Sequence, residues 1–161
     1  MLVRAIERNS VGYDYVIAAS DSPLRVKRRA DIVCDGTDDQ VEIQQTIDEL
    51  NADGGGRIFL AAGTYNISSS ITLKSGIYIE GVCPITGTSG INDLVPDLQG
   101  GTMLTGPGVT IFTGNNIYGG GLVNLAFKNI ATAISSGDTE QFGLQMFELR
   151  NIFIQSPTST G

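Results

Sequence analysis

The residues of this chain that are able to do acid–base chemistry are few, because its 161 residues include no histidine and are only 17% charged. Asp138 and Glu140 lie in one Ser- and Gly-rich turn, where Lys128 and Arg150 could meet them from neighbouring strands. Two carboxylates can work as general acid and base, and a lysine or arginine beside them can accept a proton. These four residues are the catalytic candidates, and ordinary surface positions are the preferred alternative.

Two further groups have side chains suited to a sugar. Asp93 and Asp97 stand four positions apart within residues 84–101, an irregular stretch rich in glycine and proline that we interpret as an inserted loop. Tyr78 and Tyr118 carry rings able to stack on a sugar, as does Tyr65. Each group has a simpler alternative, because loop carboxylates are usually solvated and strand aromatics usually pack in a core.

A dense acidic cluster, Asp35, Asp38 and Asp39, precedes the clearest helix signal of the sequence. Carboxylates so close together could hold calcium, but aspartates are also the residues that form turns and begin helices. We prefer the turn and cap interpretation, so no metal and no cofactor is predicted, with calcium as the alternative.

The helix itself is predicted from a capping box and an apolar stripe. Thr37 and Gln40 have the spacing at which each side chain bonds the other's backbone N–H group. Ile43, Ile47 and Leu50 then recur at helical spacing, and three glycines follow that allow the helix to end. The pattern predicts an amphipathic helix that caps whatever follows it.

After the glycines the apolar period changes to two, in short runs separated by turn residues. Residues 122–127 match residues 149–154 position by position, apolar with apolar and Asn124 with Asn151. In stacked strands these asparagines would bond each other as a ladder. Closely spaced short strands and a 27-residue repeat favour an all-β solenoid of about four coils.

Several motifs together carry a resemblance to a known family. They are Asp35-Gly-Thr-Asp-Asp39, Ile43-Gln44, Ile47-Asp48, Gly54-Gly-Gly-Arg-Ile-Phe-Leu60, Ala62-Gly-Thr-Tyr65 and Ser75-Gly-Ile-Tyr-Ile-Glu-Gly81. This set resembles the N-terminal signature of the pectate-lyase-like superfamily, whose members fold as a right-handed parallel β-helix and mostly act on polysaccharides. The sequence departs from the family pattern at Cys83, which stands where a second glycine is common.

The lead-in resembles that of phage surface proteins of the same superfamily, over residues 15–35. This second resemblance implies a tail-spike-like virion protein, often trimeric and often in contact with host glycans. We therefore expect a small β-α-β preface or attachment segment at residues 1–30, followed by a capped β-helix at residues 31–161.

Charge and hydropathy exclude other classes. A net charge of −7 disfavours nucleic acid as a partner, and no run of about 18 apolar residues is present to span a membrane. Residues 1–10 lack the apolar core of a signal peptide, so the expected location, a virion or an extracellular surface, is reached by another route. Cys34 and Cys83 are expected as two thiols, with a disulfide bridge as the alternative.

The expected function follows from an asymmetry between the two ends of the solenoid. The helix covers the first coil, whereas the polar residues 156–161 offer no second helix, and an open β edge invites pairing. We therefore expect a virion structural or attachment protein that forms a homo-oligomer or binds other virion proteins, with host glycans as a candidate ligand. A fragment of a polysaccharide lyase or glycosidase, and a cell-surface carbohydrate-binding module, are the alternatives.

Overall fold

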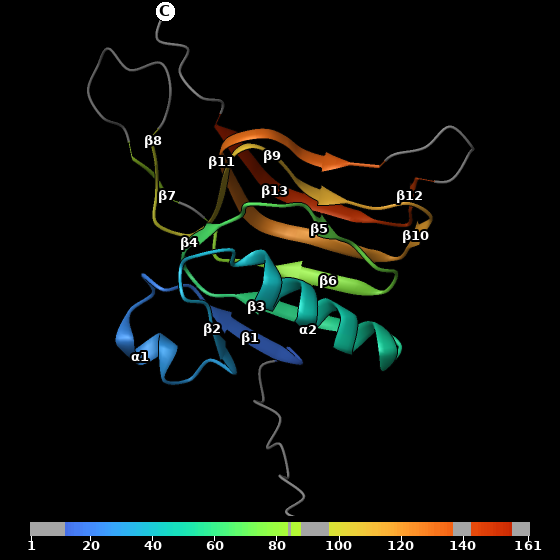
Figure 1. Ribbon diagram of the computed structural model, residues 1–161, viewed down its shortest axis with the longest axis horizontal. Helices are drawn as coiled ribbons and strands as arrows, with labels where there is room; N and C mark the ends of the chain where they lie inside the picture. The colour runs from blue at the N-terminus through green and yellow to red at the C-terminus, as the bar shows by residue number, and fades with distance from the viewer. Residues whose placement is uncertain (1–11, 84, 88–96, 137–142, 156–161) are drawn as a thin grey trace, which may run out of the picture.

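A computed structural model of the chain describes residues 12–83, 85–87, 97–136 and 143–155. Both helices lie in the first half of the described chain, and the two longest strands, β9 and β11, lie in the second half (Figure 1). The elements are β1 (Tyr15–Ala18), α1 (Leu24–Lys27), β2 (Ile32–Val33), α2 (Gln40–Ala52), β3 (Gly56–Leu60), β4 (Gly63–Asn66), β5 (Ile71–Thr72), β6 (Ile77–Glu80), β7 (Ile85–Gly87), β8 (Asp97–Gln99), β9 (Thr102–Thr113), β10 (Ile117–Tyr118), β11 (Gly120–Ser135), β12 (Leu144–Gln145) and β13 (Glu148–Gln155).

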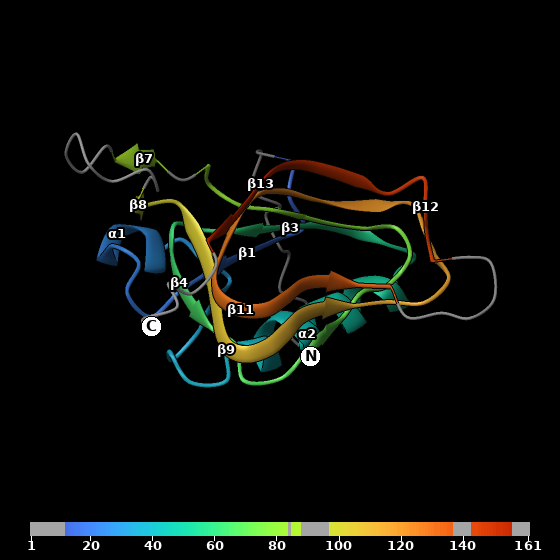
Figure 2. The same cartoon turned by 90° about the horizontal axis from the view of Figure 1, so that it is seen from above.

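The main sheet has nine strands that pair in parallel and curve into a half-barrel. Its path runs β2-β1-β3-β6-β11-β9-β4, with β13 added to β11 and β5 added to β9. The long strands β9 and β11 bend, so the sheet turns around the core and its two sides face each other (Figure 2). Two small pairs lie outside it, the parallel pair β10-β12 and the antiparallel pair β7-β8.

The predicted right-handed parallel β-helix is wrong. The described strands form one curved, mostly parallel sheet with two helices, which is neither a solenoid nor purely β. The repeat misled for a physical reason. A 27-residue spacing requires only that one strand lie beside the next, and β11 and β13 satisfy it by pairing Leu122 with Leu149 and Leu125 with Ile152. Adjacency does not dictate how the sheet closes.

Helix α2 forms as predicted, but it begins differently. Ile43, Ile47 and Leu50 are buried, as the apolar stripe requires. The capping box is wrong, because the N-cap is Asp39, and its side chain makes no capping hydrogen bond. Instead, Gln40 pairs with the opposite segment, where its Oε1 accepts the backbone N–H of Ser68 at 3.0 Å and its Nε2 donates to the Ser68 hydroxyl.

The core lies between α2 and the concave side of the sheet. Tyr65, Phe112 and Phe127 are its largest fully buried side chains, and the two phenylalanine rings meet edge to face at 6.1 Å. Strand β1, from the predicted preface, belongs to the same sheet, since it pairs in parallel with β3 from Tyr15 opposite Ile58 to Ile17 opposite Leu60. The predicted loop at residues 84–101 contains the antiparallel pair β7-β8.

Candidate functional site

The predicted catalytic group is only partly described. Asp138 and Glu140 lie outside the described residues. Arg150 faces Val123 across the β11–β13 pair, whereas Lys128 faces Gln155 near the other end of that ladder. Arg150 is instead paired with Glu148, its Nε lying 2.8 Å from the Glu148 carboxylate. The structure therefore does not bring Lys128 and Arg150 together.

The sugar-stacking candidates differ in how far their rings can be reached. Tyr65 is fully buried and donates its hydroxyl to Ile17 O at 2.9 Å, so it is a packing residue. Tyr78 is half-buried, and the Arg57 guanidinium lies 5.9 Å from its ring centre. Tyr118 on β10 is 59% exposed.

The loop carboxylates are described only in part. Asp93 lies outside the described residues, and Asp97 is the first residue of β8, where it is paired opposite Gly87.

The acidic cluster is used for local structure. The buried Asp39 carboxylate accepts the backbone N–H groups of Gly36 at 2.9 Å and Asn66 at 2.8 Å. Asp38 has a left-handed backbone and accepts a hydrogen bond from the Ser68 hydroxyl. Asp35 accepts the N–H of Thr37 at 2.7 Å. The bonds made by Asp39, which join the segment after β2 to α2 and to β4, are called the Asp39 clasp below.

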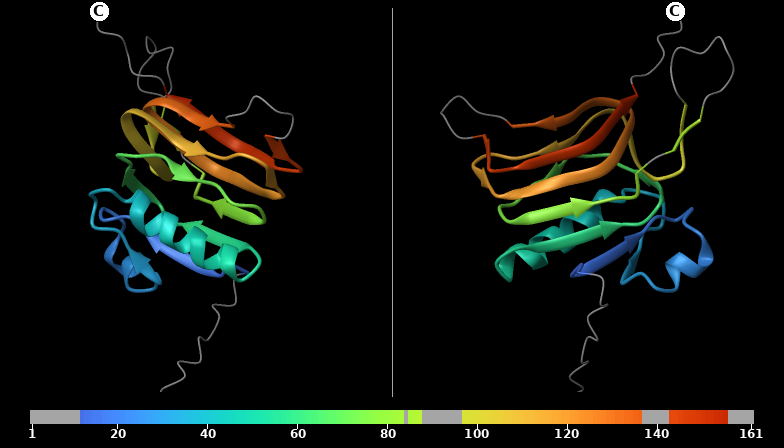
Figure 3. Two further views of the ribbon diagram at one scale, coloured as in Figure 1. Left: turned by 45° about the vertical axis from the view of Figure 1, so that its right-hand side comes forward. Right: turned by 180° about the vertical axis from the view of Figure 1, so that it is seen from behind.

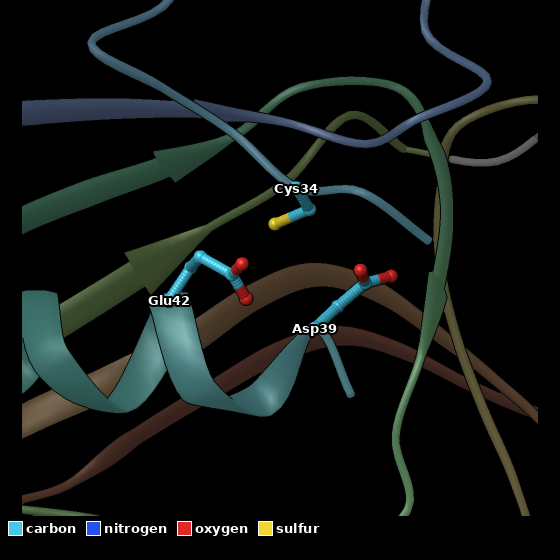
Figure 4. A group of neighbouring side chains, drawn as sticks. All are labelled: Cys34, Asp39 and Glu42. Atoms are coloured by element: carbon cyan, nitrogen blue, oxygen red, sulfur yellow. The ribbon is translucent and has the colours of Figure 1, made fainter. Parts of the chain in front are cut away.

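One group of neighbouring side chains was not predicted from the sequence. Cys34, on the segment after β2, faces Asp39 and Glu42 at the beginning of α2 (Figure 4). One ligand atom from each residue lies within 4.8 Å of the other two. The available signal was the spacing of Asp39 and Glu42, three apart on one helix face, but nothing in the sequence places Cys34 against that face.

The chemistry of this group is set by burial. Cys34 is 1% exposed, and its burial, with the carboxylates of Asp39 and Glu42 adding to the effect, raises the pKa of the thiol to about 12. Burial also raises the pKa of Asp39. A thiol and two carboxylates are donor types that zinc-like cations bind. The raised pKa keeps the thiol protonated at neutral pH, and a protonated thiol is a poor nucleophile.

A polar pocket of about 480 Å³ opens beside the C-terminal half of α2. Four segments line it, namely Asn51 at the end of α2, residues 72–75 at and after β5, residues 113–117 from β9 to β10, and Ser135 at the end of β11. Ser75 fixes this arrangement by accepting the backbone N–H of Tyr118 at 3.0 Å. The polar residues that line the pocket include Asn51, Thr72, Lys74, Ser75, Asn115 and Asn116.

The end of the sheet formed by β13 is open. β13 pairs with β11 alone among the described strands, and the two lie at the end of the molecule farthest from β1 (Figure 3). Leu149 and Ile154 continue the interior columns above Leu122 and Phe127, yet they are 52% and 59% exposed. Together with the half-buried Ile152, they line a groove beside the second half of β11.

Both cysteines are free. Cys34 is buried and Cys83 exposed, so the alternative of a bridge between them is not realised in the structure.

Comparison of the chain with protein-family models, with curated proteins and with solved structures gives no match. Neither helix of the described residues has the length and apolar character needed to cross a bilayer.

Proposed function

We propose that this chain is a structural subunit that assembles with a second copy of itself through β13. The observation that carries the proposal is the exposed pair Leu149 and Ile154, which occupy core positions of the sheet with no further layer of described residues above them. Apolar columns of this kind are stabilised when another layer removes them from water, at about 25 cal/mol for each Å² covered.

The unpaired edge of β13 supports the same conclusion. A strand paired on one side only presents a row of backbone N–H and C=O groups to solvent, and a second strand satisfies them. If two copies meet across a two-fold axis, β13 runs antiparallel to its partner. A register centred between Asn151 and Ile152 then places each Leu149 opposite the partner's Ile154, so the two most exposed core positions cover each other.

Charge also fits a second copy as the occupant. The chain carries a net charge of −7, which opposes association of two copies over most of their surface. At β13, however, Glu148 and Arg150 neutralise each other as a close ion pair. The edge is therefore a place where two copies can approach without repulsion between like charges.

Sedimentation of the purified chain tests the assembly. We expect twice the chain mass of 17.0 kDa for the two-fold contact. Three times that mass, the trimer that the resemblance implies, would contradict a two-fold contact through β13. Leu149→Lys places a charge in the contact and is expected to return the protein to the monomer mass. Val41→Lys is the matched control, because Val41 is 59% exposed on α2, away from β13, and it should leave the assembly intact.

Two further results would refute the proposal. One is a wild-type monomer at protein concentrations of about 0.1 mM, where even weak specific contacts are populated. The other is a Leu149→Lys protein that keeps the wild-type mass. Far-UV circular dichroism of each variant shows that a change of mass is not a loss of fold.

The setting proposed for this assembly is the surface of a virion or phage, in contact with other virion proteins. Its support is the similarity of residues 15–35 to the lead-in of phage surface proteins. Peptide mass spectrometry of particles purified from the source culture tests it, and particles free of this chain would place the assembly elsewhere. No specific observation among the described residues favours the enzyme fragment, whereas the polar pocket beside α2 bears on the carbohydrate-binding module.

A further inference from the structure

We propose that the polar pocket beside α2 binds a small carboxylic acid that carries several hydroxyl groups, with Lys74 holding the carboxylate. This inference goes beyond assembly through β13 and does not depend on it, because the pocket and the open end involve different residues.

The walls of the pocket are pre-formed by hydrogen bonds between its segments. Leu73 donates its N–H to Thr113 O at 2.7 Å, and Tyr118 donates to the Ser75 hydroxyl oxygen at 3.0 Å. Gly76 donates to Tyr118 O at 3.2 Å, so both turns are tied together on each side of the cavity. A volume of about 480 Å³ is within the size range of small-molecule sites.

The charge of the pocket favours a monoanion. Among the described residues that line it, Lys74 is the one charged side chain and no carboxylate is present. Lys74 also forms no ion pair with any residue in the described part of the chain. In a protein with a net charge of −7, one uncompensated ammonium group attracts a single negative charge. A phosphate dianion is usually bound by more cations or by arginine.

The remaining lining favours hydroxyl groups on the ligand. The side-chain amides of Asn51, Asn115 and Asn116 line the cavity and form no hydrogen bond within the described residues. Each amide can donate and accept, which is what a hydroxyl group requires of its partner. A plain anion would leave these amides unused.

Amide chemical shifts of the ¹⁵N-labelled full chain test the proposal, with D-glucuronate and D-gluconate as cyclic and linear probes. We expect saturable shifts at residues 72–75 and 113–117 with a dissociation constant of about 1 mM, typical of a ligand this small. Stronger binding of glucuronate would indicate a saccharide unit as the natural ligand, and stronger binding of gluconate a linear hydroxy acid. D-Glucose, which lacks the charge, and acetate, which lacks the hydroxyl groups, should both bind at least tenfold more weakly.

Three variants show which groups act. Lys74→Ala should weaken glucuronate binding about tenfold or more, and Lys74→Arg should restore most of it, because charge-assisted hydrogen bonds are the strong ones. Asn115→Ala should weaken glucuronate binding but leave the weak acetate binding unchanged. Arg25→Ala removes an equal charge from the exposed surface of α1 and should change neither.

The proposal is overturned if neither acid shifts these resonances, or if acetate binds as well as glucuronate, which would make the pocket a simple anion site. It is also overturned if Arg25→Ala weakens binding as much as Lys74→Ala. A well-dispersed amide spectrum for each variant excludes unfolding as the cause.

Discussion

Replacing Asp39 with asparagine tests the Asp39 clasp, which joins three segments of the fold. The carboxylate is fully buried and uses both oxygens, one for the N–H of Gly36 and one for the N–H of Asn66. Asparagine has the same shape but a single acceptor oxygen. Its NH₂ group would therefore face one of the two backbone N–H groups, and that donor would be buried without a partner.

The cost of Asp39→Asn follows from this loss. A hydrogen bond to a charged group contributes about 1.5–3 kcal/mol, and a stranded buried donor costs about 1–3 kcal/mol. Part of this is offset, because burial of the charged carboxylate is itself unfavourable, as its raised pKa shows. We expect a net loss of about 2–3 kcal/mol, a large share of the 5–15 kcal/mol that stabilises a typical domain. The melting temperature should fall by about 4–12 °C.

Urea unfolding followed by far-UV circular dichroism measures this loss. Asp38→Asn is the matched control, since Asp38 is the exposed neighbour and its left-handed backbone, with φ of 56°, suits asparagine. Asp38→Asn should change stability by no more than about 0.5 kcal/mol. If Asp39→Asn costs no more than this control, the Asp39 clasp does not hold the segments together.

The pH dependence of the stability difference between wild type and Asp39→Asn gives a second test of the Asp39 clasp. Burial raises the pKa of Asp39, so the folded protein binds this proton more tightly than the unfolded chain. That contribution to stability is complete below the ordinary value of 3.8 and is lost as pH rises through the raised pKa. Asparagine does not titrate. The stability difference between wild type and Asp39→Asn should therefore narrow as pH rises through this window, and a widening difference would contradict the assignment.

Two further predictions concern other contacts. At pH 8, Ellman's reagent should react only with the exposed Cys83 in the native protein, and with Cys34 as well once denaturant is added. The reason is that the Cys34 thiol is buried and its pKa is raised to about 12. Two reactive thiols in the native protein would contradict the burial of Cys34. Asn151→Gly should lower the free energy of unfolding by about 1 kcal/mol, because it removes the 2.8 Å hydrogen bond from Asn151 Nδ2 to Asn124 Oδ1. Asn151→Ala should lower it by about 1–2 kcal/mol more, because the backbone at this position is left-handed, with φ of 52°. Urea unfolding of both variants checks the order, and an alanine variant as stable as the glycine variant would show that the backbone is not strained.

Helix α2 shows which features can be predicted from local sequence. The buried stripe of Ile43, Ile47 and Leu50 follows from helical spacing alone, and the structure has it. The beginning of the helix does not follow from spacing. Gly36 takes a left-handed backbone with φ of 93°, and the next turn leaves Asp39 rather than Thr37 at the N-cap. The partner that decides this, Asn66, lies on a strand 27 positions away.

The strands show a similar limit over longer distances. Alternation and the repeat predicted that residues 122–127 lie beside residues 149–154, and that asparagines meet asparagines, which the register and the Asn151–Asn124 bond now show. The predicted solenoid path was wrong because β11 pairs with different strands along its length. It pairs with β6 at Gly120–Val123 and with β9 from Ala126 onward. The change falls at Asn124, whose backbone is left-handed with φ of 57°. An asparagine in the sequence is compatible with such a bend, but it does not indicate which strand pairs on either side of it.

The sites follow the same rule, because chemistry at each depends on segments that only the fold brings together. Lys74 was not singled out, since one lysine after a short strand has no pattern. It becomes distinctive because the β9–β10 turn brings Asn115 and Asn116 to the same cavity, and no carboxylate is among the described residues that line it. Conversely, the densest acidic cluster of the sequence is used up by backbone N–H groups and a serine hydroxyl. For this protein, a side chain left without an internal partner is a better guide to function than a cluster of charges in the sequence.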